Sequence, residues 1–141
     1  MALTIRLDPP LGPDALKALW DRVPRTRGRD PEAVMRAVQG SALVATAWED
    51  DRLVGAVRVI TDGVYYAALC DLVWDPAAAA EAVVRPLLQA AVAPFLGRNF
   101  RAIVLLDADA EPELLADLGF EPSTGSWRRV HTAEERPARG V

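Results

Sequence analysis

The sequence contains little of the chemistry that builds disulfides or metal sites, with one cysteine, Cys70, and one histidine, His131, among 141 residues. A lone cysteine excludes an internal disulfide and is typical of reducing compartments. These two residues do not make up the ligand set of a usual zinc site, so we expect no metal ion. No apolar run has the roughly 18 residues of a membrane-spanning helix, and the N-terminus lacks a signal-peptide pattern. The absences predict a cytoplasmic protein without a membrane partner.

Lysine is almost absent too, because Lys17 is the only one and arginine supplies the remaining positive charge. The 16 basic residues are outnumbered by 20 acidic ones, which gives a net charge of −4. Nucleic-acid binding needs clustered basic residues, so this balance argues against a nucleic-acid partner. Length and apolar content are ordinary for one globular domain. We assign residues 1–131 to that domain and expect a disordered tail over 132–141.

Several segments have the composition of β-strands. They lie at 3–7, 42–48, 53–60, 64–74, 101–106 and 126–131. The pair Asp62-Gly63 favours a tight type I′ turn, since both central residues of that turn need positive φ. The near-continuous apolar run Arg101–Leu106 predicts a central buried strand, and Ser126–His131 predicts the last strand.

Helix signals separate these strands, at 13–22, 31–38, somewhere within 77–96, and at 111–118. Asp30-Pro31-Glu32 combines an N-cap residue, a first-turn proline and an acid favoured by the helix dipole. Gly119 suits the position after a helix end. Pro86 favours a third helix that is regular only from about Arg85, with the proline in its first turn. The element order β-α-α-β-β-β-α-β-α-β predicts an α/β (α+β) fold.

Four stretches in this order carry a family resemblance. They read "DDRLVGAVRVITDG", "ALCDLVWDP", "LLADLGFEPS" and "GSWRRV". Residues 41–130 thereby resemble the GNAT superfamily of acetyl-CoA-dependent N-acetyltransferases. The resemblance implies a mixed, mostly antiparallel sheet of 6–7 strands with helices on both faces, and parallel fourth and fifth strands that splay apart at one end. It also implies transfer of an acetyl group from acetyl-CoA to an amine of a small molecule or peptide.

The pyrophosphate loop of the family, Q/R-x-x-G-x-G/A, falls on Ala79–Val84 of this sequence. In such a loop, glycines let backbone amides at a helix N-terminus approach the phosphates. Here Ala82 and Val84 replace the glycines, and Glu81 adds a negative charge. We expect Val84 to block the closest approach and the loop to be degenerate. Any remaining cofactor contacts would come from the backbone amides of Leu72, Val73, Ala80, Ala82, Val84 and Arg85.

The tyrosine that often serves as general acid in the family aligns with Leu115, which has no proton to give. Asp71 lies where the family often carries an acidic residue near the acceptor amine, and is a candidate general base. Its alternative role is a solvent-facing carboxylate on an alternating strand. Tyr65 and Tyr66 are further catalytic candidates, since their opposite facings predict that one packs in the core while the other lines the acceptor side.

Arginines at 22, 25, 27 and 29 crowd the loop between the first two helices. They would either attract an acidic substrate or form an ordinary solvated loop. Two functions therefore stay open for the chain. One is a divergent N-acetyltransferase of weak or no activity, and the other is a catalytically silent GNAT-fold module for binding or homodimer formation.

Overall fold

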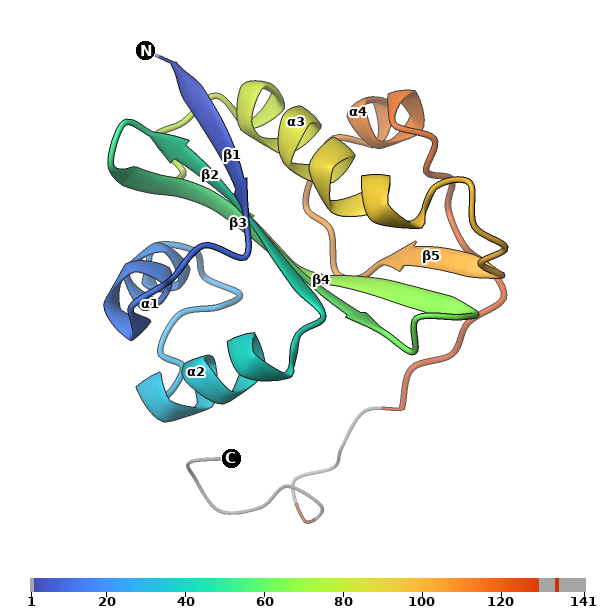
Figure 1. The fold of residues 1–141 in the computed structure, drawn as a ribbon, viewed down its shortest axis with the longest axis horizontal. Coiled ribbons are helices and arrows are strands. Elements are labelled where there is room, and N and C mark those ends of the chain that lie inside the picture. The colour runs from blue at the N-terminus through green and yellow to red at the C-terminus, as the bar shows by residue number, and fades with distance from the viewer. Residues whose placement is uncertain (1, 130–133, 135–141) are drawn as a thin grey trace.

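The computed structural model describes residues 2–129 and 134. Five strands form one sheet in the order β1-β2-β3-β4-β5 (Figure 1). They are β1 (Leu3–Leu7), β2 (Leu43–Glu49), β3 (Arg52–Thr61), β4 (Tyr66–Trp74) and β5 (Ala102–Leu105). Strands β1 to β4 pair antiparallel, and β5 runs parallel to β4. The predicted mixed, mostly antiparallel sheet with a parallel β4–β5 pair is confirmed.

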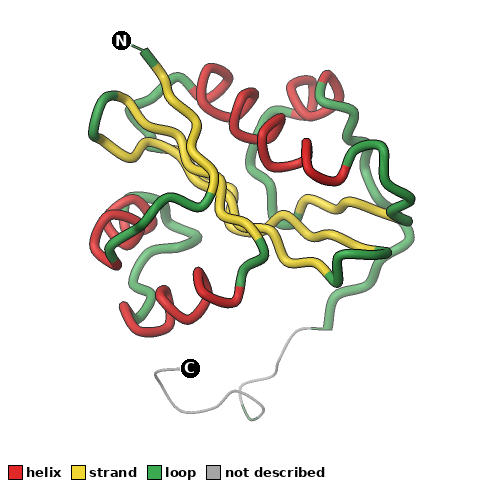
Figure 2. The backbone as a smooth tube through the Cα atoms, viewed as in Figure 1, coloured by secondary structure: helices red, strands yellow, loops and turns green. Residues whose placement is uncertain are grey.

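Helices cover both faces of this sheet, as predicted (Figure 2). They are α1 (Pro13–Asp21), α2 (Pro31–Gly40), α3 (Ala80–Val92), the short 3-10 helix η1 (Ala93–Phe95) and α4 (Pro112–Asp117). Figure 1 shows α1 and α2 on one face, and α3 and α4 on the other. The sheet that contains the β4–β5 pair thus lies between a layer of α1 and α2 and a layer of α3 and α4.

The predicted helix signals act as expected at two places. The Asp30 carboxylate accepts a hydrogen bond from the Ala33 N–H at 3.0 Å, so it caps the N-terminus of α2. After α4, Gly119 adopts a φ of +90° and donates its N–H to the Ala116 carbonyl at 3.0 Å. Both ends are therefore determined by local chemistry.

The core has one apolar cluster on each face of the sheet. The side chains of Leu69, Leu87 and Leu88 are fully buried between the sheet and α3. On the other face, α1 buries Leu19 and Trp20 against the sheet. Burying a side chain of this size contributes roughly 1.5–3 kcal/mol, so the two clusters hold the helices that flank the site.

Strand β3 approaches α3 most closely at Gly55, where a Cβ atom would lie 2.6 Å from Cγ1 of Val83. We expect Gly55→Ala to lower the free energy of unfolding by about 1–3 kcal/mol, because the added methyl forces the β3–α3 contact apart. Chemical denaturation measures this change. Gly40→Ala is the matched control, since nothing lies within 4 Å of its added methyl. Equal stability of the two variants would contradict the close contact.

The predicted type I′ turn at Asp62-Gly63 is wrong. Gly63 has a φ of +78° but Asp62 does not have positive φ, and the β3–β4 connection runs from 62 to 65. The Asp62 carboxylate accepts hydrogen bonds from the N–H groups of Val64, Tyr65 and Tyr66, which holds the pKa of that carboxyl below its usual value. The side chain, rather than two positive φ angles, closes the connection.

The prediction of a central buried strand at Arg101–Leu106 is also wrong in its position. β5 is the last strand of the sheet, and Val104 is 36% exposed. Residues 126–129 form no strand, so the predicted closing strand is wrong for them, and His131 lies outside the described residues. Most of the expected tail, 132–141, lies outside them as well. The described residues thus form five strands rather than the expected six or seven, and β5 is the last of these five.

Helix α3 begins at Ala80, earlier than predicted, and Pro86 is its seventh residue rather than part of its first turn. The reason is the buried face formed by Val83, Val84, Leu87 and Leu88, whose spacing favours one helix through the proline. The hydrogen bond lost at the proline falls on the carbonyl of Ala82, which is an exposed residue.

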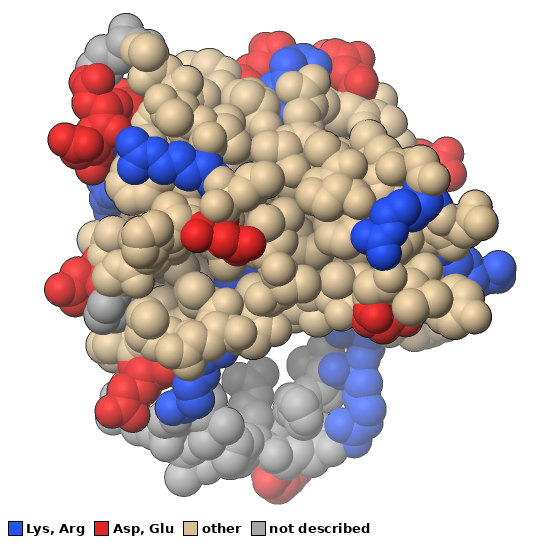
Figure 3. All heavy atoms as spheres, in the orientation of Figure 1, with Lys and Arg blue, Asp and Glu red and all other residues tan. Residues whose placement is uncertain are grey.

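Charged side chains are dispersed over the face of the molecule seen in Figure 3, and Lys and Arg form no continuous patch on that face. No helix in the described part of the chain is long and apolar enough to cross a membrane.

Candidate functional site

The β4 strand contains a bulge at the point where it leaves β5. Asp71 has a φ of +55°, and the β3–β4 register shifts between Ala56 and Arg58. β5 pairs with β4 only from Tyr66 to Leu69. β5 ends at Leu105, so within the described residues the β4 segment 72–74 has no strand beside it on the β5 side. We call this opening beside residues 72–74 the splay.

The splay is occupied in part by Arg25, from the loop between α1 and α2. Its Nη2 donates to the Leu72 carbonyl at 2.7 Å, and its Nε lies 3.5 Å from a carboxylate oxygen of Asp109. A small hollow of about 150 Å³ remains there, lined by Val23, Arg25, Leu72, Val73, Trp74, Pro76 and Asp109. A guanidinium thus lies beside Leu72, whose backbone amide is one of the predicted cofactor contacts.

The other arginines of this loop also contact the protein itself. Arg22 pairs with the buried Asp75 at 2.9 Å, and Arg27 donates to the Asp21 carbonyl at 3.0 Å. Arg29 makes two hydrogen bonds with Asp71. Arg25 and Arg29 thus fasten the loop to β4, whereas Arg22 and Arg27 stay exposed, and attraction of an acidic substrate stays a prediction.

Asp71 is held between two arginines. Arg29 donates to both of its carboxylate oxygens at 2.8 and 2.9 Å, and Arg58 donates through Nε at 3.0 Å. Burial alone would raise the pKa of this carboxyl, but the hydrogen bonds and charges of both arginines outweigh it and hold the pKa below its usual value. Such a carboxylate is a weak base, so the geometry argues against Asp71 as the general base.

Tyr65 precedes β4, and Tyr66 begins it opposite Ala102 of β5, whereas the splay follows Leu69. Six residues of strand separate Tyr66 from Leu72, which is roughly 20 Å. Both tyrosines are exposed, at 60% and 53%, so the prediction that one packs in the core is wrong. Neither tyrosine reaches the splay.

The N-terminus of α3 lies beside the splay and carries the predicted cofactor loop. Ala79 is the N-cap without a side-chain cap, and the Val83 N–H makes the first helical bond, to the Ala79 carbonyl at 3.3 Å. The N–H groups of residues 80–82 therefore lack helical partners, whereas those of Val84 and Arg85 lie inside the helix. Val84 is fully buried in the core. Its predicted obstruction of the phosphates is wrong.

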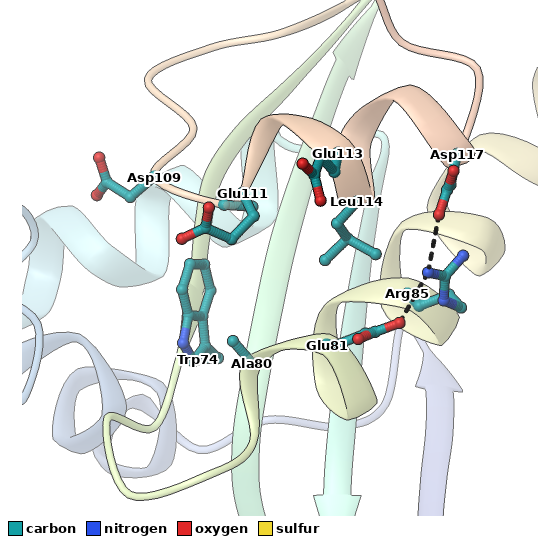
Figure 4. A pocket seen from close by; sticks show the side chains of 10 residues that line it. Trp74, Ala80, Glu81, Arg85, Asp109, Glu111, Glu113, Leu114 and Asp117 are labelled. Atoms are coloured by element: carbon teal, nitrogen blue, oxygen red, sulfur yellow. Dashed lines mark hydrogen bonds and ion pairs between the residues drawn. The ribbon is translucent and has the colours of Figure 1, made fainter.

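A larger hollow of about 300 Å³ lies between the N-terminus of α3, the end of β4 and α4. Its lining is Trp74, Ala80, Glu81, Arg85, Asp109, Ala110, Glu111, Glu113, Leu114 and Asp117. We call this hollow the acidic pocket, because five carboxylates and one guanidinium line it. Figure 4 shows Glu81 and Arg85 reaching in from α3, and Glu113, Leu114 and Asp117 from α4.

The one guanidinium of the acidic pocket is already paired. Arg85 lies 2.9 Å from Glu81 and 3.5 Å from Asp117, so it joins α3 to α4 (Figure 4). The hydrogen bonds that Arg85 donates, to Glu81 first and also to Asp117, raise the pKa of Arg85. The guanidinium of Arg85 near the α3 N-terminus is therefore paired with carboxylates of the protein itself.

Leu115, at the position of the expected general acid, packs against the core cluster under α3. Three features of the site were not predicted from the sequence: the position of Arg25 beside Leu72, the two arginines on Asp71, and the acidity of α4. Only the last had a signal, in the spacing of Asp109, Glu111, Glu113 and Asp117 along the stretch "DADAEPELLAD". Within the described residues, no group of His, Cys, Asp and Glu is arranged to hold a metal ion.

Comparison with known proteins rests on structure, since no family model and no curated protein sequence matches the chain. A GNAT-family acetyltransferase from Streptococcus pneumoniae TIGR4 superposes with a TM-score of 0.73 at 20% identity, over 92% of this chain and 100% of that one. An acetyltransferase from Trypanosoma brucei gives 0.65 at 14% identity, over 92% and 100%.

A third solved structure, a GNAT-family acetyltransferase from Brucella melitensis in complex with acetyl-CoA, gives a TM-score of 0.64 at 21% identity. The match covers 86% of this chain and 84% of that one. Identities in this range establish the fold and no further property. From its sheet, its splay and these likenesses, the chain has the fold of the GNAT acetyltransferases.

Proposed function

We propose that this chain is a GNAT-fold binding module whose cofactor site holds acetyl-CoA weakly and supports little or no acetyl transfer. The observation that carries the proposal is the lining of the acidic pocket, where five carboxylates face one guanidinium that is already paired. The fold, shared with a solved GNAT–acetyl-CoA complex, indicates where the cofactor of an active relative would lie.

Acetyl-CoA is a polyanion with a diphosphate and a further phosphate, so it needs positive charge or free amides. The free N–H groups of Ala80, Glu81 and Ala82 at the α3 N-terminus, and the β4 backbone at Leu72 and Val73, supply the favourable part. The carboxylates of the acidic pocket oppose it, because the same pocket is lined by Ala80 and Glu81 of this N-terminus. The residues present therefore fit the group poorly.

The residues near the splay also lack the groups that acetyl transfer needs. Leu115 has no proton to donate to a leaving thiolate, and Asp71 is paired with Arg29 and Arg58. Arg25 narrows the space beside Leu72. These observations favour a protein that keeps the fold for binding rather than for turnover.

The second candidate function is a divergent N-acetyltransferase that acts on a small-molecule or peptide amine. The splay of β4 from β5 favours it, because backbone groups at a splay do not depend on side-chain identity. A polar group brought by the acceptor would then have to replace the missing acid and base.

An acetyl-transfer assay separates the two candidates. We expect the protein, given acetyl-CoA and a panel of amines that includes spermidine and a lysine peptide, to release free CoA thiol no faster than the heat-denatured protein does. Detection of the thiol by a chromogenic disulfide measures this directly. Release that saturates with one amine, and that Arg25→Ala alters, would establish the acetyltransferase instead.

A further inference from the structure

The small hollow in the splay differs from the acidic pocket in its size and in its lining. We call it the splay hollow. Its volume is about 150 Å³, and a cavity of about that size in a protein core holds one benzene-sized molecule. The apolar part of its lining consists of Val23, Leu72, Val73, Trp74 and Pro76. Ligand sites typically combine such a lining with a few placed polar groups, so the two charged residues of the hollow determine what it binds.

The first of these charged residues, Arg25, is held in place but is not fully satisfied. Its Nη2 donates to the Leu72 carbonyl at 2.7 Å, which fixes the guanidinium against β4. Its Nε is buried and makes no hydrogen bond among the described residues. A buried donor without an acceptor is uncommon in folded proteins. Arg25 therefore offers the hollow a positioned positive charge with N–H donors to spare.

The second charged residue, Asp109, is only a loose partner of Arg25. One carboxylate oxygen lies 3.5 Å from Nε, and no hydrogen bond joins the two groups. The Asp109 side chain is 68% exposed, and Figure 4 shows its carboxylate directed away from Trp74 and Glu111. An exposed ion pair of this kind contributes little to stability. A carboxylate that makes the missing hydrogen bond can therefore displace Asp109 at small cost.

A single carboxylate on an apolar body matches this arrangement. The planar fork of a guanidinium fits the two oxygens of a carboxylate, and hydrogen bonds between charged partners are the stronger kind. One guanidinium balances one negative charge. The rest of the lining is apolar, so a second charge on the ligand would lie there without a partner. The hollow thus favours a monocarboxylate over a phosphate dianion or a neutral molecule.

We propose that the splay hollow binds a small monocarboxylate of about benzoate size, whose carboxylate pairs with Arg25 in place of Asp109. The body of the ligand contacts the apolar lining over Leu72 and Val73. The inference deepens the proposed function by naming a ligand class, and it rests on that function in one respect, that the protein binds a ligand. It requires no acetyl-CoA.

NMR titration of the full chain with sodium benzoate tests the ligand class. We expect saturable shifts of the amide signals of Leu72, Val73 and Trp74. Benzamide has the same shape without the charge, so we expect it to bind about tenfold or more weakly. Inorganic phosphate is expected to leave these signals in place. Benzoate without saturation, benzamide of equal affinity, or phosphate that shifts the same signals as strongly would overturn the proposal.

Three variants test the role of Arg25. Arg25→Gln is expected to weaken benzoate binding about tenfold or more, because it removes the positive charge. Asp109→Asn is expected to strengthen it about threefold, since it removes a competing carboxylate whose ion pair is weak. The matched control is Arg27→Gln, at an exposed arginine of the same loop outside the lining, and it should change little.

Circular dichroism checks that each variant is folded, and the benzamide comparison needs no variant. A folded Arg25→Gln that binds benzoate as the wild type does, an equal loss in Arg27→Gln, or weaker binding by Asp109→Asn would contradict the proposal. These titrations contain no acetyl-CoA. Failure of benzoate to bind would therefore remove this ligand class and leave weak acetyl-CoA binding to be tested by its own titration.

Discussion

Asp71→Asn is expected to lower the free energy of unfolding by about 3 kcal/mol at neutral pH, because it leaves two buried or half-buried guanidiniums without their carboxylate. The Asp71 side chain is 10% exposed and that of Arg58 is 14% exposed, so solvent compensates Arg58 little, whereas it compensates Arg29, at 36%, in part. Asparagine tolerates the φ of +55° at this position, so the substitution tests the charge rather than the backbone. Urea denaturation measures the loss.

The pH dependence of stability in wild type and Asp71→Asn tests whether the charge of Asp71 is responsible. The folded-state pKa of Asp71 lies below its usual value. The contribution of Asp71 to the free energy of unfolding is therefore fully present above the pKa of the unfolded state, and is lost as pH falls through the pKa of the folded state. The stability gap between wild type and Asp71→Asn should therefore be constant from about pH 5 to 8 and narrow only below about pH 4. Glu32→Gln, at an exposed ion pair, is the control and should change little. A gap that already narrows near pH 6 would contradict the assigned role.

Neutralising the acidic pocket is expected to raise acetyl-CoA affinity by about tenfold or more, the change that 1.4 kcal/mol makes in a binding constant. The variant is Glu81→Gln with Glu113→Gln and Asp117→Asn. It removes three negative charges from the lining and also releases Arg85 from both of its carboxylate partners. Val84 is left unchanged, since it is buried in the core and its removal would open a cavity.

The gain in acetyl-CoA affinity should become smaller as salt is added, because ions screen charges at exposed side chains. Glu32→Gln with Glu121→Gln and Asp14→Asn removes the same charge from positions outside the acidic pocket lining, and serves as the control. If both triple variants gained affinity equally, net charge rather than the pocket would be responsible. If neither gained, the carboxylates would not be what limits binding.

The parts of the fold that could be predicted from sequence are those set by neighbouring residues. Asp30-Pro31 begins α2 as predicted and Gly119 follows α4 as predicted, because caps act within one helical turn. The parallel pairing of β4 and β5 also followed, since a helical crossover between two strands of one sheet requires it.

The features that failed depend on residues distant in sequence. Pro86 alone favours a helix start, but burial of Leu87 and Leu88 against the sheet carries α3 through it. Asp71 has the pattern of an exposed strand residue, and only the fold brings Arg29, 42 positions earlier, onto it. Aligning Val84 with the family's loop motif gives its position along the chain but not the direction of its side chain. In the structure the helix directs that side chain into the core.

The most direct test of the weak-cofactor account is calorimetric titration of the unmodified protein with acetyl-CoA at low and at high salt. The acidic pocket predicts no saturation below about 1 mM at low salt, and binding that strengthens as salt screens the carboxylates. An ordinary phosphate site gives the reverse dependence, since its binding weakens as salt rises. Binding near 10 µM at low salt that weakens with added salt would contradict the account.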